Sequence, residues 1–177
     1  MQKIRFTTCS QREAELLDNN SCCIRNFTKP VMISITSPLE DRANIEVKIP
    51  ILRLQFDDID KDDISKITTL PLQPFTKGDA MKIFDFIEFE KPDMIITHCK
   101  AGVCRSAAVN AALSKIILGK DDRFFQEKVP NMLVYTTMLN YWFVDLLQYS
   151  EIHKEMSAKH IHPWIYKMRV KHFKKIH

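Results

Sequence analysis

A cysteine and an arginine six positions apart are the side chains of this sequence best suited to covalent chemistry. Cys99 and Arg105 flank a short loop around Gly102, and the segment 98–106 is His-Cys-Lys-Ala-Gly-Val-Cys-Arg-Ser. A cysteine thiolate is a nucleophile, and its pKa, about 8.5 in a free cysteine, falls to roughly 3.5–7.5 near a cation or a helix N-terminus. An arginine guanidinium binds two phosphate oxygens at once. The pair therefore indicates a cysteine that attacks a phosphate.

The elements that flank this loop should position both side chains. The apolar segment 94–98 predicts a strand, and the small residues of 106–118 predict a helix. Unpaired N–H groups at a helix start point into the preceding loop, and the helix dipole adds positive potential. The loop is therefore a natural anion site. The nucleotide-binding fingerprint Gly-x-x-x-x-Gly-Lys-Ser/Thr is absent from the sequence, which argues against a nucleotide P-loop.

His-Cys-x-x-Gly-x-x-Arg-Ser, as it stands at 98–106, resembles the signature of cysteine-dependent protein tyrosine phosphatases. The chain length and other landmarks resemble the compact dual-specificity branch of that superfamily. The resemblance is tight at 98–106, moderate across 51–150, and weak in the first 45 residues and in the tail. It implies an α/β fold with a central, mostly parallel sheet flanked by helices.

The resemblance and the residues together imply a two-step reaction without metal or cofactor. Cys99 attacks phosphorus and forms a phosphocysteine while Asp58 protonates the departing oxygen, and water activated by Asp58 then hydrolyses the intermediate. Arg105 and the loop amides hold the phosphate oxygens, and Ser106 eases departure of the thiolate. His98 should face away from the substrate and orient the loop. The phosphate-binding loop is expected to comprise Lys100, Ala101, Gly102, Val103, Cys104 and Arg105.

Three aspartates compete for the role of general acid. Asp58 follows the apolar strand end at 54–56, which resembles the place of the acid in dual-specificity phosphatases. Asp57 is the close alternative and Asp63 a distant one, whereas a solvated acidic loop is the ordinary interpretation of such a cluster. The separation between Asp58 and Cys99 exceeds what the resemblance implies, which suggests an insertion at 66–78.

Alternating strands and helices along the rest of the chain predict the same α/β class. Strands are expected at 4–8, 31–36, within 45–56 and at 94–98. Capping boxes predict helices from Ser10 to about Asn19 and from Thr76 to about Glu90. A short helix should start at Asp121-Asp122, and a last long helix should follow Pro130-Asn131. The last helix is expected to pack through an apolar stripe of Leu133, Met138, Leu139, Trp142, Phe143, Leu146 and Leu147.

Composition bounds the domain organisation and the compartment. The 177 residues, 45% hydrophobic and 27% charged, suit one globular domain. We expect a catalytic domain over 1–153 and a basic extension over 154–177. The five cysteines are irregularly spaced and do not indicate a disulfide framework, and no apolar run approaches the ~20 residues of a membrane span. Without an export signal, a cytoplasmic protein is expected, although non-classical secretion would leave no mark.

The expected substrate is a phosphoprotein carrying phosphotyrosine, with phosphoserine and phosphothreonine as further candidates. A phosphoinositide, an RNA 5′-phosphate and a catalytically silent phosphate-binding module are the alternatives. Lys100 resembles phosphoinositide phosphatase loops, but those carry a second lysine where this chain has Val103. Residues 164–175 mix aromatic and basic side chains. Packing on the domain is favoured for them, an anionic membrane or an acidic partner is the alternative, and nucleic acid is not expected.

Overall fold

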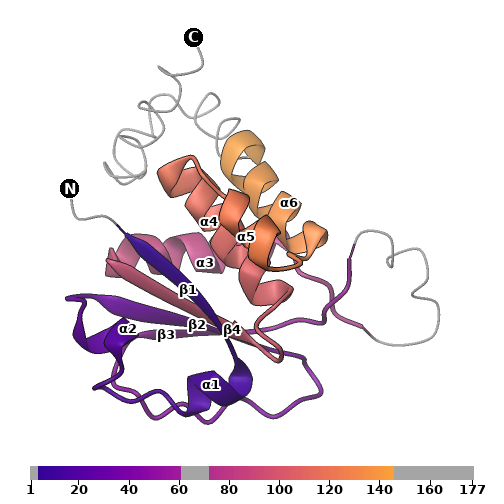
Figure 1. The fold of residues 1–177 in the computed structure, drawn as a ribbon. Coiled ribbons are helices and arrows are strands. Elements are labelled where there is room, and N and C mark those ends of the chain that lie inside the picture. Colours follow the sequence, from indigo (N-terminus) through magenta and orange to yellow (C-terminus); the bar gives the residue numbers. More distant parts are fainter. Residues whose placement is uncertain (1–3, 61–71, 146–177) are drawn as a thin grey trace.

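Within residues 4–60 and 72–145, the part of the chain that the computed structural model describes, four parallel strands form one sheet. These strands are β1 (Arg5–Ser10), β2 (Pro30–Thr36), β3 (Ile51–Gln55) and β4 (Met94–Cys99). Their order is β1-β4-β2-β3, so β4, which leads into the cysteine loop, lies inside the sheet (Figure 1). The predicted α/β fold with a mostly parallel central sheet is confirmed.

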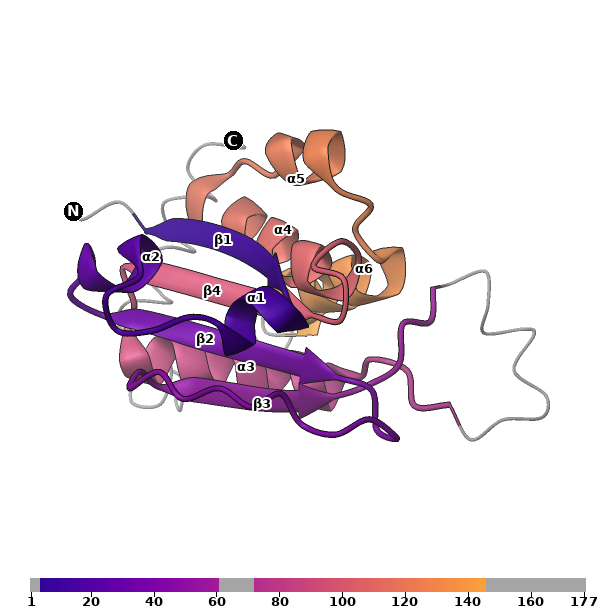
Figure 2. The same ribbon diagram turned by 60° about the horizontal axis from the view of Figure 1, so that its bottom comes forward.

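Helices cover both faces of this sheet (Figures 1 and 2). One face carries α3 (Lys77–Glu90), α4 (Arg105–Leu118), α5 (Asp122–Glu127) and α6 (Met132–Asn140), and the other carries α1 (Gln11–Glu15) and α2 (Cys22–Arg25). Alternate strand residues point to opposite faces, which gives two apolar clusters. Ile33, Ile35 and Ile95 belong to the larger cluster, and Met32 and Ile96 belong to the smaller one.

The predicted ends of α3 and α4 are set by local chemistry. The Thr76 hydroxyl accepts a hydrogen bond from the Asp79 N–H, and the Asp79 carboxylate accepts one from the Thr76 N–H, which completes the expected capping box. At the far end of α4, Gly119 adopts a left-handed conformation with φ 73° and caps the helix. No helix in the described residues is long and apolar enough to cross a membrane.

The first helix is shorter than predicted. We expected a helix to about Asn19, but α1 ends at Glu15. An Asp18 carboxylate oxygen accepts hydrogen bonds from the Asn20 N–H at 3.1 Å and from the Ser21 hydroxyl at 2.8 Å. Such short polar side chains compete with helical backbone bonds and favour turns. The extended segment expected within 45–56 is likewise a strand only over Ile51–Gln55.

The last helix departs from its predicted stripe. α6 passes into a π-helical turn, Tyr141–Asp145. A π turn adds a residue per turn and rotates the side chains that come after it, so a stripe drawn at constant helical spacing loses its register. Trp142 stays buried against Phe84, whereas Phe143 is 39% exposed, so its placement in the core was wrong. Leu146 and Leu147, the tail segments 154–177 and 164–175, and Asp63 lie outside the described residues.

Candidate active site

Three loops meet at the carboxyl ends of the strands, where parallel α/β sheets gather their sites. They come after β2, β3 and β4 (Figure 2). Arg105, at the start of α4, joins them because its Nη1 donates to the Phe56 carbonyl at 2.8 Å and to the Ser37 hydroxyl at 3.1 Å. Only 3% of the surface of this residue is exposed. The arginine is therefore fixed by contacts from two strand ends before any ligand binds.

Gly102 allows the cysteine loop to lie against the end of β1. Its φ is +71°, and a Cβ built there would lie 2.5 Å from the Cys9 carbonyl carbon and 2.7 Å from the Ser10 nitrogen. No side chain fits this space, and the left-handed backbone itself favours glycine. The Gln11 N–H also donates to the Lys100 carbonyl at 3.2 Å. The loop conformation therefore depends on the β1–α1 junction.

Cys99 lies at the base of this loop with 2% of its surface exposed. Its Sγ is 3.2 Å from the Ser106 Oγ. Burial alone would raise the pKa of the thiol. Hydrogen bonds from the hydroxyl and N–H of Ser106 and from the N–H of Gly102, together with the positive charge of Arg105, outweigh burial and lower the pKa of Cys99 below its ordinary value. The site therefore favours the thiolate, which is the nucleophilic form.

The remaining donors of Arg105 make the loop suitable for an anion. Its Nε is buried and has no hydrogen-bond acceptor among the described residues. A buried donor without an acceptor is costly, so this nitrogen can bind an oxygen that the described residues do not supply. The Asp58 carboxylate lies 3.8 Å away, close enough for an ion pair but too far for a hydrogen bond. A phosphate oxygen would supply the hydrogen-bond acceptor that this nitrogen lacks among the described residues.

The aspartates after β3 have separate partners. The Asp58 Oδ1 accepts a hydrogen bond from the Asn131 Nδ2 at 2.9 Å, and its Oδ2 faces Arg105. The Asp57 carboxylate accepts instead from the Gln73 N–H at 2.9 Å. The structure therefore brings Asp58 to the cysteine loop, whereas the Asp57 carboxylate is bonded to Gln73, in the segment before α3.

Asn131 and Asp60 hold the acidic segment, and the sequence assigned neither of them this role. Asn131 also donates to the Ile59 carbonyl at 2.9 Å, and its backbone N–H donates to the Cys104 carbonyl at 3.3 Å. Asp60 accepts from the N–H groups of residues 132 and 133 at the start of α6. From the sequence, Pro130-Asn131 was interpreted as a turn and as a step that resembles the dual-specificity pattern, but no contact was assigned to it, because contacts across more than 70 positions carry no local signal.

His98 lies on β4 with no exposed surface. Successive strand residues point to opposite faces, so its ring and the Cys99 thiol leave the strand on different sides. The ring Nε2 is 2.7 Å from the Ser34 Oγ on β2. Burial and the nearby charge of Arg53 lower the pKa of His98 to about 4. The ring is therefore neutral near pH 7, in keeping with the expected orienting role.

The loop also has a charged contact that was not predicted. Lys100, on the outer side of the loop, pairs with Glu40 from the segment after β2. The hydrogen bond from Lys100 holds the pKa of Glu40 below its ordinary value.

At Cys104, burial and the Asp58 carboxylate raise the pKa of the thiol, so it is protonated. Within the described residues, no cluster of three or more His, Cys, Asp or Glu side chains could hold a metal ion.

Comparisons with known proteins bear on the fold. No protein-family model and no curated protein matches the sequence. Among solved structures, the human tyrosine phosphatase-like serine/threonine/tyrosine-interacting protein has a TM-score of 0.53 at 18% identity, covering 80% of this chain and 93% of that one. Human DUSP28 has a TM-score of 0.49 at 16% identity, covering 82% and 94%. A mouse putative dual specificity phosphatase complexed with zinc tungstate has 0.46 at 18%, covering 81% and 84%.

Identities this low show the fold and nothing finer. The comparison rests on the first of these structures, because its TM-score is 0.53. It extends over most of both chains, so the similarity is not confined to the cysteine loop. The chain therefore has the dual-specificity phosphatase-like fold of cysteine-dependent phosphatases.

Proposed function

We propose that this protein is a metal-independent, cysteine-dependent phosphatase that hydrolyses phosphate monoesters on proteins. One observation carries the proposal: a buried thiol with a lowered pKa shares its loop with a buried arginine whose Nε has no acceptor among the described residues. A nucleophile and a prepared oxyanion site in one loop are what phosphoryl transfer to sulfur requires. The dual-specificity phosphatase-like fold supports the same class of reaction.

In the first step, the Cys99 thiolate attacks phosphorus. A sulfur–phosphorus bond forms while the bond to the leaving oxygen breaks, and Asp58 gives its proton to that oxygen. The position of Asp58 beside Arg105, and the bond from Asn131 that holds its other oxygen, support this assignment over Asp57. Asp63 remains the distant alternative.

In the second step, water replaces the sulfur. The Asp58 carboxylate takes a proton from the water, whose oxygen attacks phosphorus while the sulfur–phosphorus bond breaks. Ser106, whose hydroxyl lies 3.2 Å from the Cys99 sulfur, donates a hydrogen bond to the departing thiolate. Arg105 stabilises the charge on the phosphate oxygens together with the loop amides of residues 100–105. His98 orients the loop through Ser34.

The loop surroundings support a phosphoprotein over a polyanionic lipid. Lys100 could add positive charge for a second phosphate, but it is paired with Glu40. The carboxylate cancels that charge and would repel further anionic groups near the loop. A substrate with one phosphate and few other negative charges fits this balance best. Phosphotyrosine is the first candidate, and phosphoserine and phosphothreonine come next.

The test is turnover of para-nitrophenyl phosphate in EDTA across about pH 5–8, with acid-quench trapping of the phosphoenzyme. Wild type should turn over and form an acid-stable phosphoenzyme, and Cys99→Ser should do neither. Asp58→Asn should lose about 100-fold or more, whereas the matched Asp57→Asn should lose little. Binding of phosphopeptide without turnover in wild type would identify a silent phosphate-binding module and overturn the proposal. Preferred cleavage of a 5′-phosphorylated RNA would overturn the substrate class.

A further inference from the structure

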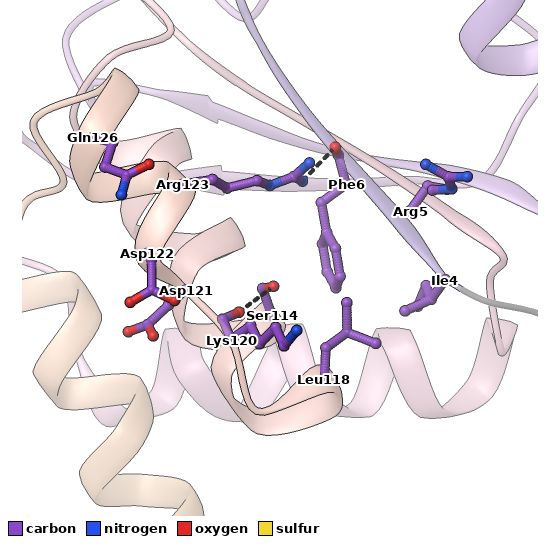
Figure 3. Close-up of a pocket in the computed structure, with 10 residues that line it drawn as sticks. All are labelled: Ile4, Arg5, Phe6, Ser114, Leu118, Lys120, Asp121, Asp122, Arg123 and Gln126. Atoms are coloured by element: carbon purple, nitrogen blue, oxygen red, sulfur yellow. Dashed lines mark hydrogen bonds between the residues drawn. The ribbon is translucent and has the colours of Figure 1, made fainter.

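A hollow of about 380 Å³ lies at the opposite end of β1 and α4 from the cysteine loop. β1 begins at the hollow and ends against the loop, while α4 begins at the loop and ends at the hollow. The volume falls within the ~300–1,000 Å³ range of small-molecule pockets. Its lining residues are Ile4, Arg5, Phe6, Ser114, Leu118, Lys120, Asp121, Asp122, Arg123 and Gln126 (Figure 3).

The floor of the hollow is apolar and its walls are held in place. Ile4 and Phe6 form the floor with Leu118, which is 38% exposed. The Ser114 hydroxyl donates to the Lys120 carbonyl at 2.6 Å and fixes the turn after α4. Because this hydrogen bond joins two groups of the protein itself, this wall of the hollow is in place without a ligand.

Three cationic side chains surround this floor. Arg5, Lys120 and Arg123 are exposed, and within the described residues none of them forms an ion pair with a carboxylate. Arg123 is the most constrained, because its Nη2 donates to the Phe6 carbonyl at 2.9 Å and its guanidinium lies 4.5 Å from the Phe124 ring centroid. Its other N–H groups remain available in a fixed geometry that suits a carboxylate or phosphate.

Within the described residues, neither carboxylate of the lining forms an ion pair with these cations. Asp121 accepts from Lys115 at 3.0 Å and from the Tyr135 hydroxyl, which commits it to the side away from the hollow. In Figure 3 the carboxylates of Asp121 and Asp122 lie on the far side of the site from Phe6 and Leu118. The hollow therefore combines an apolar floor with a cationic rim whose side chains form no ion pair among the described residues.

We propose that this hollow binds a small amphipathic anion, with a carboxylate or phosphate head joined to an apolar chain or ring. The head would bind Arg123 and Arg5, with Lys120 supplying a further charge. The apolar body would cover Ile4, Phe6 and Leu118 and remove their surface from water. The site is distinct from the cysteine loop and does not depend on phosphatase activity.

The test is a ¹⁵N NMR titration of the full chain with octanoate and, in a second arm, octylphosphonate. Both probes should saturate shifts of the Phe6, Ser114 and Leu118 amides, and the tighter one identifies the preferred head group. Neutral octanamide should bind about tenfold more weakly, the loss expected when a charge-assisted bond is removed. Inorganic phosphate, added to the octanoate-bound protein at a concentration that saturates the cysteine loop, should leave the octanoate-induced shifts unchanged.

Charge variants separate a site from general attraction to a basic protein. Arg123→Gln and Arg5→Gln should each weaken octanoate about tenfold. Arg5 donates no side-chain bond within the described residues, so its variant should keep the fold even if Arg123→Gln does not. Arg12→Gln, on α1 and outside the hollow, makes the same change in net charge and should bind as wild type does. Equal weakening by Arg12→Gln, equal affinity for octanamide, or loss of the shifts with inorganic phosphate would each overturn the proposal.

Discussion

The Asn131 Nδ2 lies 2.9 Å from the Asp58 Oδ1 across 73 positions of sequence. Asn131 is the N-cap of α6, where its Oδ1 accepts from the Val134 N–H at 3.0 Å, and its own N–H donates to the Cys104 carbonyl. One residue thus contacts the helix it begins, the cysteine loop and the proposed general acid. It fixes Asp58 relative to the nucleophile without touching the substrate, so we assign it as a positioning residue.

Replacing Asn131 by serine should impair acid catalysis more than folding. Serine caps helices well, but its shorter side chain lacks the amide N–H that donates to Asp58 while a separate oxygen caps the helix. We expect kcat/KM to fall about 10- to 100-fold for aryl phosphates with poor leaving groups, which need the proton most, and clearly less for para-nitrophenyl phosphate. The control is Asn140→Ser, at the exposed end of the same helix. An equal loss with all leaving groups would contradict a role in placing the acid.

Ser106→Ala should raise the pH at which Cys99 becomes reactive. The Ser106 hydroxyl stabilises the thiolate and so contributes to lowering the pKa of Cys99; without it the pKa must rise. The pH profile of alkylation by iodoacetamide, a neutral reagent, reports this pKa directly. Its midpoint should move upward in the variant.

The matched control for that profile is Ser114→Ala. Ser114 is a buried serine of the same helix whose hydroxyl bonds to the Lys120 carbonyl rather than to the thiol. Its profile should overlay that of wild type. A midpoint that stays unchanged in Ser106→Ala would show that the backbone N–H groups and Arg105 set the pKa without the hydroxyl.

His98 should make stability depend on pH below neutrality. Its pKa is about 4 in the folded chain against an ordinary 6.5, so the unfolded chain binds a proton more readily. The stabilisation is fully present above pH 6.5 and is lost as the pH falls toward 4. From pH 7 to pH 5 this single group should cost about 2 kcal/mol.

Urea unfolding at both pH values measures the total loss of stability, to which other carboxylates and histidines also contribute. His98→Gln removes the titrating ring while keeping an amide that can reach Ser34. The variant should therefore lose about 2 kcal/mol less than wild type over the same interval. If wild type and variant lose the same amount, the buried ring does not titrate as described.

The cysteine loop was predictable because its information is local. One short segment contains the strand, the glycine that the left-handed turn requires and the helix of small residues. The structure places Cys99, Arg105 and Ser106 together. The capping box at Thr76 is equally local and was found. The fold class was predictable for the same reason, since alternation of strands and helices is a property of neighbouring residues.

The missed features are those set by partners far away in the sequence. Asn131, Asp60 and Glu40 reach the site only through tertiary contacts, and nothing beside them in the chain marks those contacts. The early end of α1 was missed because Asp18 forms side-chain bonds that compete with the helix. A capping box fixes where a helix starts but says nothing about where it stops.

Glu40 should restrain the charge of the loop, and removing it should widen the substrate range. Glu40→Gln frees Lys100 and leaves an uncompensated ammonium beside the phosphate site. Turnover of a polyanionic substrate, such as the soluble head group of a phosphoinositide bisphosphate, should rise up to about fivefold relative to para-nitrophenyl phosphate, the range of an exposed ion pair. The gain should shrink as salt is added, because the loop is open to solvent.

Two variants decide whether that gain comes from the contact or from net charge. Glu46→Gln makes the same change of charge at an exposed position and should leave the substrate ratio unchanged. Lys100→Gln combined with Glu40→Gln should return the ratio to that of wild type, because the released ammonium is then absent. A ratio that stays high in the double variant would mean that Glu40 repels polyanions directly, and Lys100 would lose its part in the selectivity.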